Sequence, residues 1–313
     1  MWGYVLKRTL SIIPVSGVVA VLAFLLLRLS PGDPAIIMAG DSATAEQIAA
    51  MRSHMGLDQP LVAQFLLWLS HILRGDLGVS LHSAVPVTEM IGGRVGPTLA
   101  LAVTTMTFSV LVAIPMGLLA AWARGTSLDR AIMALAVLGF SAPVFVTGYT
   151  LVWLLSIKAG WFPIQGYAGL SEGFWAFARH IALPALSLST IYVALIARIC
   201  RSSILEILNE DFIRTARAKG AGETTVFLRH ALRNAAVPIV TVIGLGAAFL
   251  ISGVVVAESV FNIPGVGRLV VESVLARDYP LIQALILLFS CVYILLNLVI
   301  DLSYTLLDPR IRY

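Results

Sequence analysis

The chain is poor in charged residues. Asp, Glu, Lys and Arg make up 12% of its 313 residues, which is about half the share found in soluble domains. Hydrophobic residues make up 59% of the chain, and the mean hydropathy is +0.93. Apolar runs of about 20 residues, the length that a helix needs to cross a bilayer, recur along the sequence. These features exclude an ordinary soluble domain and predict a polytopic membrane protein.

Several motifs are also missing. No series of alternating segments of about ten residues occurs, so a transmembrane β-barrel is not expected. The two cysteines, Cys200 and Cys291, have neither metal-ligand spacing nor a CxxC partner, which argues against a disulfide framework. Neither G-x-x-x-x-G-K-[ST] nor H-E-x-x-H occurs, so the sequence offers no motif for a nucleotide site or an intramembrane zinc hydrolase.

Six apolar runs are long enough to span a membrane, and we expect an all-α protein with six transmembrane helices. The runs cover roughly residues 9–29, 98–122, 131–156, 181–200, 236–258 and 281–306. Lys7 and Arg8 precede the first run, as they would in a signal peptide. However, the run from Leu10 to Leu27 is long and no A-x-A site follows it, which favours a retained span.

The basic residues indicate the orientation. If both termini are cytoplasmic, the cytoplasmic segments hold thirteen of the 21 Lys and Arg residues and the outer segments hold eight. Basic residues favour the cytoplasmic side, so we expect both termini there. The same clustering beside apolar runs explains the net charge of +4 without a nucleic-acid partner.

The segment 30–97 is then external. Its stretch from Leu61 to Leu73 is too short to span, and it predicts an amphipathic helix on the membrane or against other spans. Pro60 and the sequence Gly75-Asp-Leu-Gly78 indicate turns. A linker would be low in leucine and aromatic residues, and this segment is not, so we expect it to fold.

The polar segment 201–235 predicts a helix, a glycine break and a second helix. Ile204, Leu205, Leu208 and Phe212 recur at helical spacing. Glu210 and Arg214 form a favourable i,i+4 pair, worth about 0.2–0.5 kcal/mol.

Gly220 and Gly222 then break the helix, a second helix can begin at Glu223, and Pro238 suits the first turn of the next span. A solvated basic loop that only sets topology is one interpretation. An exposed apolar stripe beside charges favours the other, a docking surface for a soluble partner.

At this point the sequence resembles a known family, the bacterial ABC importer permeases, whose cytoplasmic EAA loop the polar segment matches. The likeness is closest to the dipeptide/oligopeptide/glutathione/nickel branch and extends over nearly the whole chain. The stretches that carry it are Pro31-Gly-Asp-Pro34, Gly56-Leu-Asp-Gln-Pro60, Arg74-Gly-Asp-Leu-Gly78, Glu210-Asp-Phe-Ile-Arg-Thr-Ala-Arg-Ala-Lys-Gly220, His230-Ala-Leu-Arg-Asn234, Pro264-Gly-Val-Gly-Arg268, Arg277-Asp-Tyr-Pro280 and Asp308-Pro-Arg-Ile-Arg312. The chain has Arg214-Thr215-Ala216 where many permeases have Glu-Ala-Ala, so no salt bridge can be assigned to that glutamate.

The resemblance implies a type I ABC importer permease fold in the bacterial inner membrane. It implies an N-terminal part over 1–97, a transmembrane domain over 98–306 with the coupling loop 201–235, and a cytoplasmic tail over 307–313. The implied partners are a second homologous permease subunit, two ATP-binding subunits, an extracytoplasmic solute-binding protein and membrane lipid. ATP and Mg would bind to the ATPase subunits and no cofactor to this chain, which would not be an enzyme.

The resemblance also implies an ATPase-coupling turn. Its residues would be Arg214, Thr215, Ala216, Gly220, Ala221 and Gly222. Polar groups within the spans are candidates to line the pathway, although hydrogen bonds between helices would explain most of them. These residues are Thr104, Thr107, Ser141, Thr147, Ser187, Ser189 and Ser252.

Two questions of function stay open, the substrate and the class of transporter. A di- or oligopeptide or glutathione is the first expected substrate and nickel the second. The outer histidines His54, His71, His82 and His180 match no metal-ligand motif. A secondary carrier is the rival class, but it would need a buried acidic residue or histidine at the midplane, and no span shows a convincing one.

Overall fold

The computed structural model describes residues 9–29, 35–36, 43–54 and 56–307. Across these residues the regular structure is helical, apart from an isolated antiparallel bridge between Val79 and Pro86. The described chain divides into two compact units. One comprises residues 96–268 and the residues from 295 onward, and the other comprises the residues up to 95 together with 269–294.

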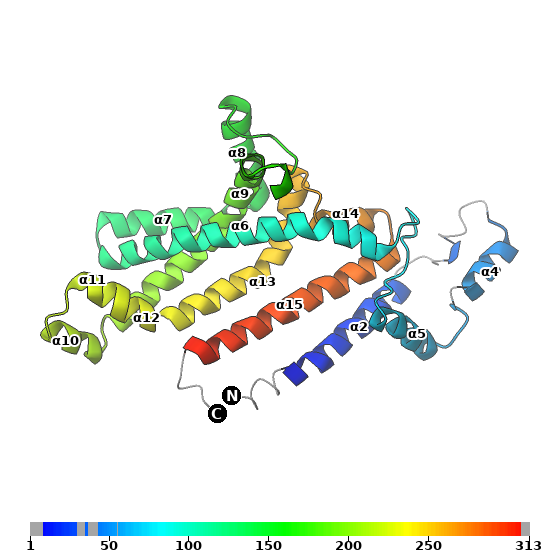
Figure 1. Cartoon of the computed structure of the whole chain (residues 1–313), viewed down its shortest axis with the longest axis horizontal. Coiled ribbons are helices and arrows are strands. Elements are labelled where there is room, and N and C mark those ends of the chain that lie inside the picture. The colour runs from blue at the N-terminus through cyan, green and yellow to red at the C-terminus, as the bar shows by residue number, and fades with distance from the viewer. Residues whose placement is uncertain (1–8, 30–34, 37–42, 55, 308–313) are drawn as a thin grey trace. The chain divides into compact units, whose positions relative to one another are not determined.

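Figure 1 shows the helices of the described residues. In chain order they are α2 (Ile12–Leu29), α4 (Ala45–His54), α5 (Leu61–Leu73), α6 (Val87–Trp122), α7 (Ser127–Ser141), α8 (Val144–Leu151), the π-helical η1 (Val152–Lys158), the short η2 (Leu170–Glu172), α9 (Phe174–Ile207), α10 (Asp211–Ala218), α11 (Glu223–Thr225), the π-helical η3 (Val226–Ala231), α12 (Leu232–Asn234), α13 (Ala236–Phe261), α14 (Val266–Leu275) and α15 (Tyr279–Leu307).

Four helices are long and apolar enough to cross a membrane among the described residues. They are α6, α9, α13 and the Tyr279–Ser303 part of α15, and they cover four of the six expected runs. The first expected run forms α2, whose apolar stretch Ile12–Leu26 is shorter than the other spans. Both α6 and α9 extend beyond the expected limits, to 36 and 34 residues.

The apolar run expected to span over 131–156 does not form one continuous helix. The run breaks after α7, and the following helix, α8 with η1, is bent by 103° from α7. Ala142 is extended, with φ −82° and ψ 123°, and Pro143 precedes the first residue of α8. A residue before proline is disfavoured in the helical region, so the chain turns there and does not merely kink.

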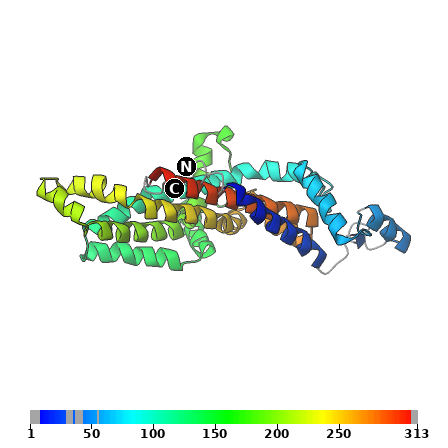
Figure 2. The same ribbon diagram turned by 90° about the horizontal axis from the view of Figure 1, so that it is seen from below.

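Helix α9 is the centre of the first unit. It packs against both α7 and α13, which lie on either side of it (Figure 2). Glycines allow these close approaches: a Cβ at Gly139 of α7 would lie 3.2 Å from the Thr190 carbonyl oxygen, and one at Gly246 of α13 would lie 3.2 Å from Tyr192. The close approach of small residues is how helices associate where lipid provides no hydrophobic drive.

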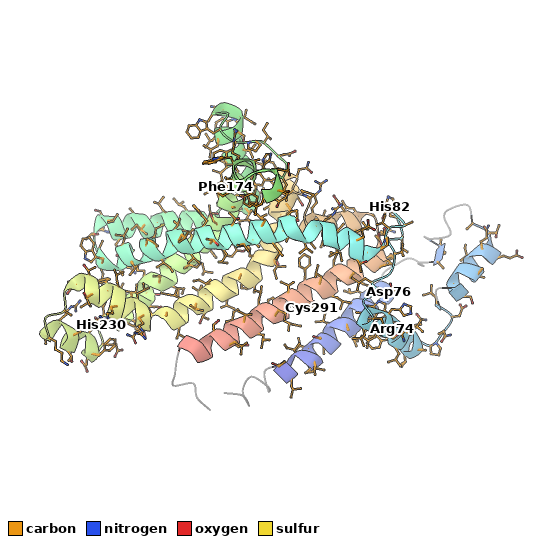
Figure 3. The ribbon with its side chains drawn as sticks, in the orientation of Figure 1. Arg74, Asp76, His82, Phe174, His230 and Cys291 are labelled. Carbon is orange, nitrogen blue, oxygen red and sulfur yellow. The ribbon has the colours of Figure 1, made fainter. Side chains whose placement is uncertain are left out.

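In the second unit, the segment predicted to be external is folded. Helix α5 spans Leu61–Leu73, as expected. Its Phe65 and Trp68 pack on Phe24 of α2, with ring centroids 5.4 and 5.6 Å apart. After α5 the chain turns at Gly75 and Gly78, both left-handed with φ +83° and +82°, and Figure 3 labels Arg74 and Asp76 in this turn. Ser80 then donates a hydrogen bond to Asp278 within the same unit.

Candidate functional site

Residues 208–235 form a hairpin of short helices between α9 and α13 (Figure 1). The predicted order of helix, glycine break and second helix is confirmed, and the second helix begins at Glu223 as expected. Ile204 and Leu205 belong to the end of α9, and a turn over 208–210 separates them from α10. Pro238 lies in the first turn of α13, also as expected. We call residues 208–235 the hairpin.

Buried apolar side chains hold the hairpin in place. Ile213 of α10 and Val226 of η3 are both 0% exposed. Burying a side chain of this size stabilises the fold by roughly 1.5–3 kcal/mol relative to leaving it exposed. A core cluster joins the second half of the hairpin to the spans; it contains Ala121, Cys200, Ile204, Ala231, Ala235 and Ile239. The hairpin is therefore anchored on the ends of α6, α9 and α13.

A Schellman turn ends α10. The N–H of Ala221 donates to the carbonyl of Ala216 at 3.1 Å, and the N–H of Gly220 donates to the carbonyl of Arg217 at 2.9 Å. Gly220 has φ +85°, a left-handed conformation that costs an L-residue with a side chain roughly 1–2 kcal/mol. Gly220 is thus required by the backbone of this turn.

Gly222 is different from Gly220. It precedes α11 with φ −67° and ψ 153°, which any residue adopts, and its carbonyl accepts from the Val226 N–H at 3.0 Å. A Cβ at Gly220 or at Gly222 would meet no atom of this chain within 4 Å. The tip of the hairpin therefore presents bare backbone, and nothing in the chain itself requires Gly222 to lack a side chain.

One ion pair crosses the turn. Arg217 Nε lies 2.8 Å from Glu223 Oε1, and Arg217 Nη2 lies 3.1 Å from Glu223 Oε2. The hydrogen bonds from Arg217 lower the pKa of the Glu223 carboxyl, and the same bonds raise the pKa of the Arg217 guanidinium. Both side chains are partly exposed, at 41% and 56%, so the pair orders the turn more than it stabilises the fold.

The expected pair between Glu210 and Arg214 is replaced by a pair with Asp211. Arg214 Nη1 lies 3.3 Å from Asp211 Oδ1. Glu210 is the residue before α10, with φ −72° and ψ 148°. Because it lies outside the helix, the i,i+4 geometry does not apply to it.

The rest of the hairpin surface is basic with apolar side chains between the charges. Lys219, Arg229 and Arg233 are exposed, and the Arg214 side chain is 75% exposed. Phe212 and Leu228 are 43% and 53% exposed. Figure 3 labels His230, which lies in η3 on this hairpin. The hairpin surface therefore offers exposed backbone at its glycine tip, positive charge and apolar contacts.

The candidate pathway residues fall into two sets. Ser187 and Ser189 are buried in α9, where their hydroxyls donate to the Pro184 and Leu186 carbonyls, each at 2.8 Å. The others are half-buried or exposed in this chain; they are Thr104, Thr107, Ser141, Thr147 and Ser252.

Glu258 is a buried charged residue that the motifs in the sequence do not indicate. It is fully buried near the end of α13. Its Oε1 accepts from the Thr98 hydroxyl at 2.6 Å and its Oε2 from the Arg268 N–H at 2.8 Å. A Cβ at Gly265 would lie 2.1 Å from Glu258 Oε1. The stretch Pro264-Gly-Val-Gly-Arg268 therefore leaves room for this carboxylate. In the sequence, the feature that could have indicated this contact is a glutamate that closely precedes the stretch.

Comparison with family models identifies the chain. Residues 113–313 match the model described as the inner membrane component of binding-protein-dependent transport systems, and residues 1–102 match the corresponding N-terminal membrane component. The chain belongs to this family.

Individual relatives are similar in sequence to this chain over their full length. A probable peptide ABC transporter permease of Sinorhizobium fredii is 49% identical over 313 residues, covering 100% of both chains. The glutathione transport system permease GsiC is 48% identical in Salmonella choleraesuis and 46% identical in Escherichia coli, again over all of both chains.

Solved structures support the same fold. An inward-facing form of the MetNI methionine ABC transporter superposes with a TM-score of 0.60 at 17% identity, covering 71% of this chain and 97% of that chain. The fold is therefore that of a type I ABC importer permease, as the sequence predicted.

Family membership confirms the resemblance found in the sequence, an ABC importer permease of the dipeptide/glutathione branch. It places the chain in an inner membrane, among proteins that work with ATPase and binding-protein partners.

Proposed function

We propose that this inner membrane component forms half of the translocation pathway for di- or oligopeptides or glutathione, and that its hairpin docks onto an ATPase subunit. The relatives that match the whole chain are named for peptide and glutathione transport, which supports this substrate class. The exact substrate would then be chosen by the solute-binding protein.

The bare glycine tip carries the docking proposal. Gly220 is required by its left-handed backbone, whereas Gly222 adopts an ordinary conformation with open space around its Cβ position. The backbone conformation of this chain does not explain why residue 222 is a glycine. Close approach of another protein to the backbone at this position would explain it, because a side chain there would be in the way. The coupling turn in this proposal consists of Arg214, Thr215, Ala216, Gly220, Ala221 and Gly222.

The complete importer would contain a second homologous permease, two ATP-binding subunits and an extracytoplasmic binding protein. ATP and Mg would bind to the ATPase subunits, and this chain would catalyse no reaction. Closure of the ATPase pair would move the hairpin and with it the ends of α9 and α13. Shifting a two-state equilibrium from 1:99 to 99:1 takes about 5.5 kcal/mol, which is within reach of nucleotide binding.

The docking proposal is tested with Gly222→Val and Gly220→Val in the tagged, assembled transporter. We expect Gly222→Val to reduce co-purification of the ATPase at least tenfold while the unfolding temperature of the isolated chain stays unchanged. Gly220→Val should reduce it too, with some loss of chain stability. Gly160→Val is the matched control for Gly220→Val, because Gly160 also has a positive φ of +69° and open space around its Cβ position but lies in the segment that precedes α9, whereas the hairpin follows α9.

Wild-type ATPase recovery in Gly222→Val would contradict docking at this turn.

The partners themselves are identified by mass spectrometry of the proteins that co-purify with the tagged wild-type chain in mild detergent. We expect a second permease, ATPases and a binding protein whose bound ligand is a peptide or glutathione. Recovery of the chain alone or as a homodimer would argue for a carrier instead.

Orientation is a separate proposal, with both termini and the hairpin on the cytoplasmic side. It is tested in a Cys291→Ser background, which removes the exposed native thiol. Lys219→Cys should react with a membrane-impermeant maleimide only in inside-out vesicles, and His82→Cys only in intact spheroplasts.

We also propose that exposed hydroxyls such as Thr107 and Ser252 line the pathway. Bound substrate should then protect cysteines placed at these positions from reaction with a maleimide.

A further inference from the structure

A partly buried ion pair joins Asp129, in the first turn of α7, to Arg201 near the end of α9. Arg201 Nε lies 2.6 Å from Asp129 Oδ1, and Arg201 Nη2 lies 2.7 Å from Asp129 Oδ2. The Asp129 side chain is 5% exposed and that of Arg201 is 26% exposed. The Gly125 N–H donates a further hydrogen bond to Asp129 Oδ2 at 2.9 Å.

This geometry is strongly directional. Two parallel N–H···O bonds between a guanidinium and a carboxylate fix the relative orientation of the two planar groups. The third bond fixes the Gly125–Asp129 turn to the same carboxylate. A buried carboxylate loses much of its hydration and is stable only with such partners. The turn cannot move away from Arg201 without breaking both Arg201–Asp129 hydrogen bonds at once.

Close packing along α9 supports the same connection. A Cβ at Gly117 of α6 would lie 2.7 Å from the Cys200 Cβ and 2.8 Å from the Ala197 carbonyl oxygen. The backbones of α6 and α9 are therefore in direct contact one turn before Arg201. With the approach at Gly139, helix α9 is held by both α6 and α7.

Arg201 is also close to the hairpin. It lies less than two turns before Ile207, the last residue of α9, and the hairpin begins at the next residue. Figure 1 shows the start of α7 and the hairpin at the same end of α9. Of the two ends of α7, the pair thus fixes the one that lies beside the hairpin.

We propose that Asp129 and Arg201 are positioning residues that transmit movement of the hairpin to α6 and α7. The inference rests on the proposed docking of the hairpin to an ATPase. When the hairpin is displaced, α9 moves with it, and the ion pair makes the α6–α7 turn follow. Without the pair, the hairpin would still bind the ATPase, but part of its movement would be lost as sliding of α9 past α7.

The test uses the complete importer, with its ATPase and binding-protein partners, reconstituted in liposomes. Asp129→Asn and Arg201→Gln each remove the charge pair, whereas Arg201→Lys keeps the positive charge and loses the two-pronged contact. Transported substrate per ATP hydrolysed is the readout, alongside co-purification of the ATPase. Glu272→Gln is the matched control, because Glu272 lies 2.7 Å from Arg94 in another ion pair.

We expect the ATPase to co-purify with every variant at the wild-type level. Transport per ATP should fall at least fivefold in Asp129→Asn and Arg201→Gln, less in Arg201→Lys, and not in Glu272→Gln. The exchanged pair Asp129→Arg with Arg201→Asp should recover part of the loss. If Asp129→Asn does not fold, Arg201→Lys carries the test.

A wild-type ratio of transport to ATP hydrolysis in folded Arg201→Lys and Arg201→Gln would overturn the proposal. So would a loss of transport that follows only the amount of folded protein recovered, since that is the result for a pair that merely stabilises the fold. Failure of the wild-type chain to recover an ATPase would instead overturn the proposed function, and the two failures are therefore distinguishable.

Discussion

Arg217 and Glu223 face each other across the glycine turn, and the guanidinium of the one binds both carboxylate oxygens of the other, at 2.8 and 3.1 Å. Arg217 belongs to α10 and Glu223 begins α11, so the pair links the two helices on either side of Gly220. The turn is thereby held in one conformation by a backbone motif and an ion pair together. A preordered turn costs less conformational entropy when a partner binds it.

The order of this turn should depend on pH. The pKa of Glu223 is lowered below its ordinary value of 4.5, so the contribution of the pair is complete above that value. It is lost as the pH falls through the lowered folded-state pKa. Hydrogen-exchange protection of the Ala221 and Val226 amides should be constant between about pH 5 and pH 7 and decrease below about pH 4.5. Glu223→Gln should give lower protection with no such step; a step that persists in this variant would contradict the assignment.

The two glycines of the turn should respond differently to a small side chain. Gly220→Ala should destabilise the isolated chain by roughly 1–2 kcal/mol, because alanine is strained in the left-handed region. Gly222→Ala should change stability by no more than about 0.5 kcal/mol. Thermal unfolding in detergent measures both. Gly220→Asn is the control, since asparagine tolerates this conformation, and equal loss in Asn and Ala variants would exclude backbone strain as the cause.

Any side chain at Gly265 should be destabilising, because Gly265 lies against the buried Glu258 carboxylate. A Cβ there would lie 2.1 Å from Glu258 Oε1, so Gly265→Ala must displace a buried, hydrogen-bonded carboxylate. Overpacking of this kind costs typically about 1–3 kcal/mol, and the unfolding temperature should fall accordingly. Gly93→Ala, at a helical position with open space, should be neutral or slightly stabilising. Similar losses in both variants would show that the effect does not come from the carboxylate.

The approach of α13 to α15 at Gly244 allows a rescue experiment. A Cβ at Gly244 would lie 2.3 Å from Ile300 Cγ1 and 2.6 Å from Ile300 Cδ1. Gly244→Ala should therefore lower the unfolding temperature, and Ile300→Ala should lower it through lost packing. The double variant should be more stable than the sum of the two losses predicts, by about 0.5–3 kcal/mol. Strictly additive losses would mean that the two residues do not meet.

The candidate site was largely predictable because its signals are local. Gly220 and Gly222 punctuate a helical pattern, and Glu223 suits the start of a helix, so the helix–break–helix order follows from residues next to one another. The different roles of the two glycines did not follow, since only the backbone conformation and the open space around each position distinguish them. Glu258 was missed because its hydrogen-bond partners include Thr98, which is 160 positions away in the chain.

The sequence by itself determined the class of this protein, the places of most spans and the limits of α5. Apolar length, proline, glycine and basic residues act over a few neighbouring positions, and that range suffices for such features. Only the tertiary structure decided that the run 131–156 breaks by 103° at Pro143, and that Asp129 meets Arg201 across 72 positions. A proline indicates that a helix is interrupted, but it does not determine how far the chain turns. The angle between α7 and α8 depends on the packing of α8 against α9 and α13. A charged residue likewise carries no local sign of a partner that only folding brings beside it.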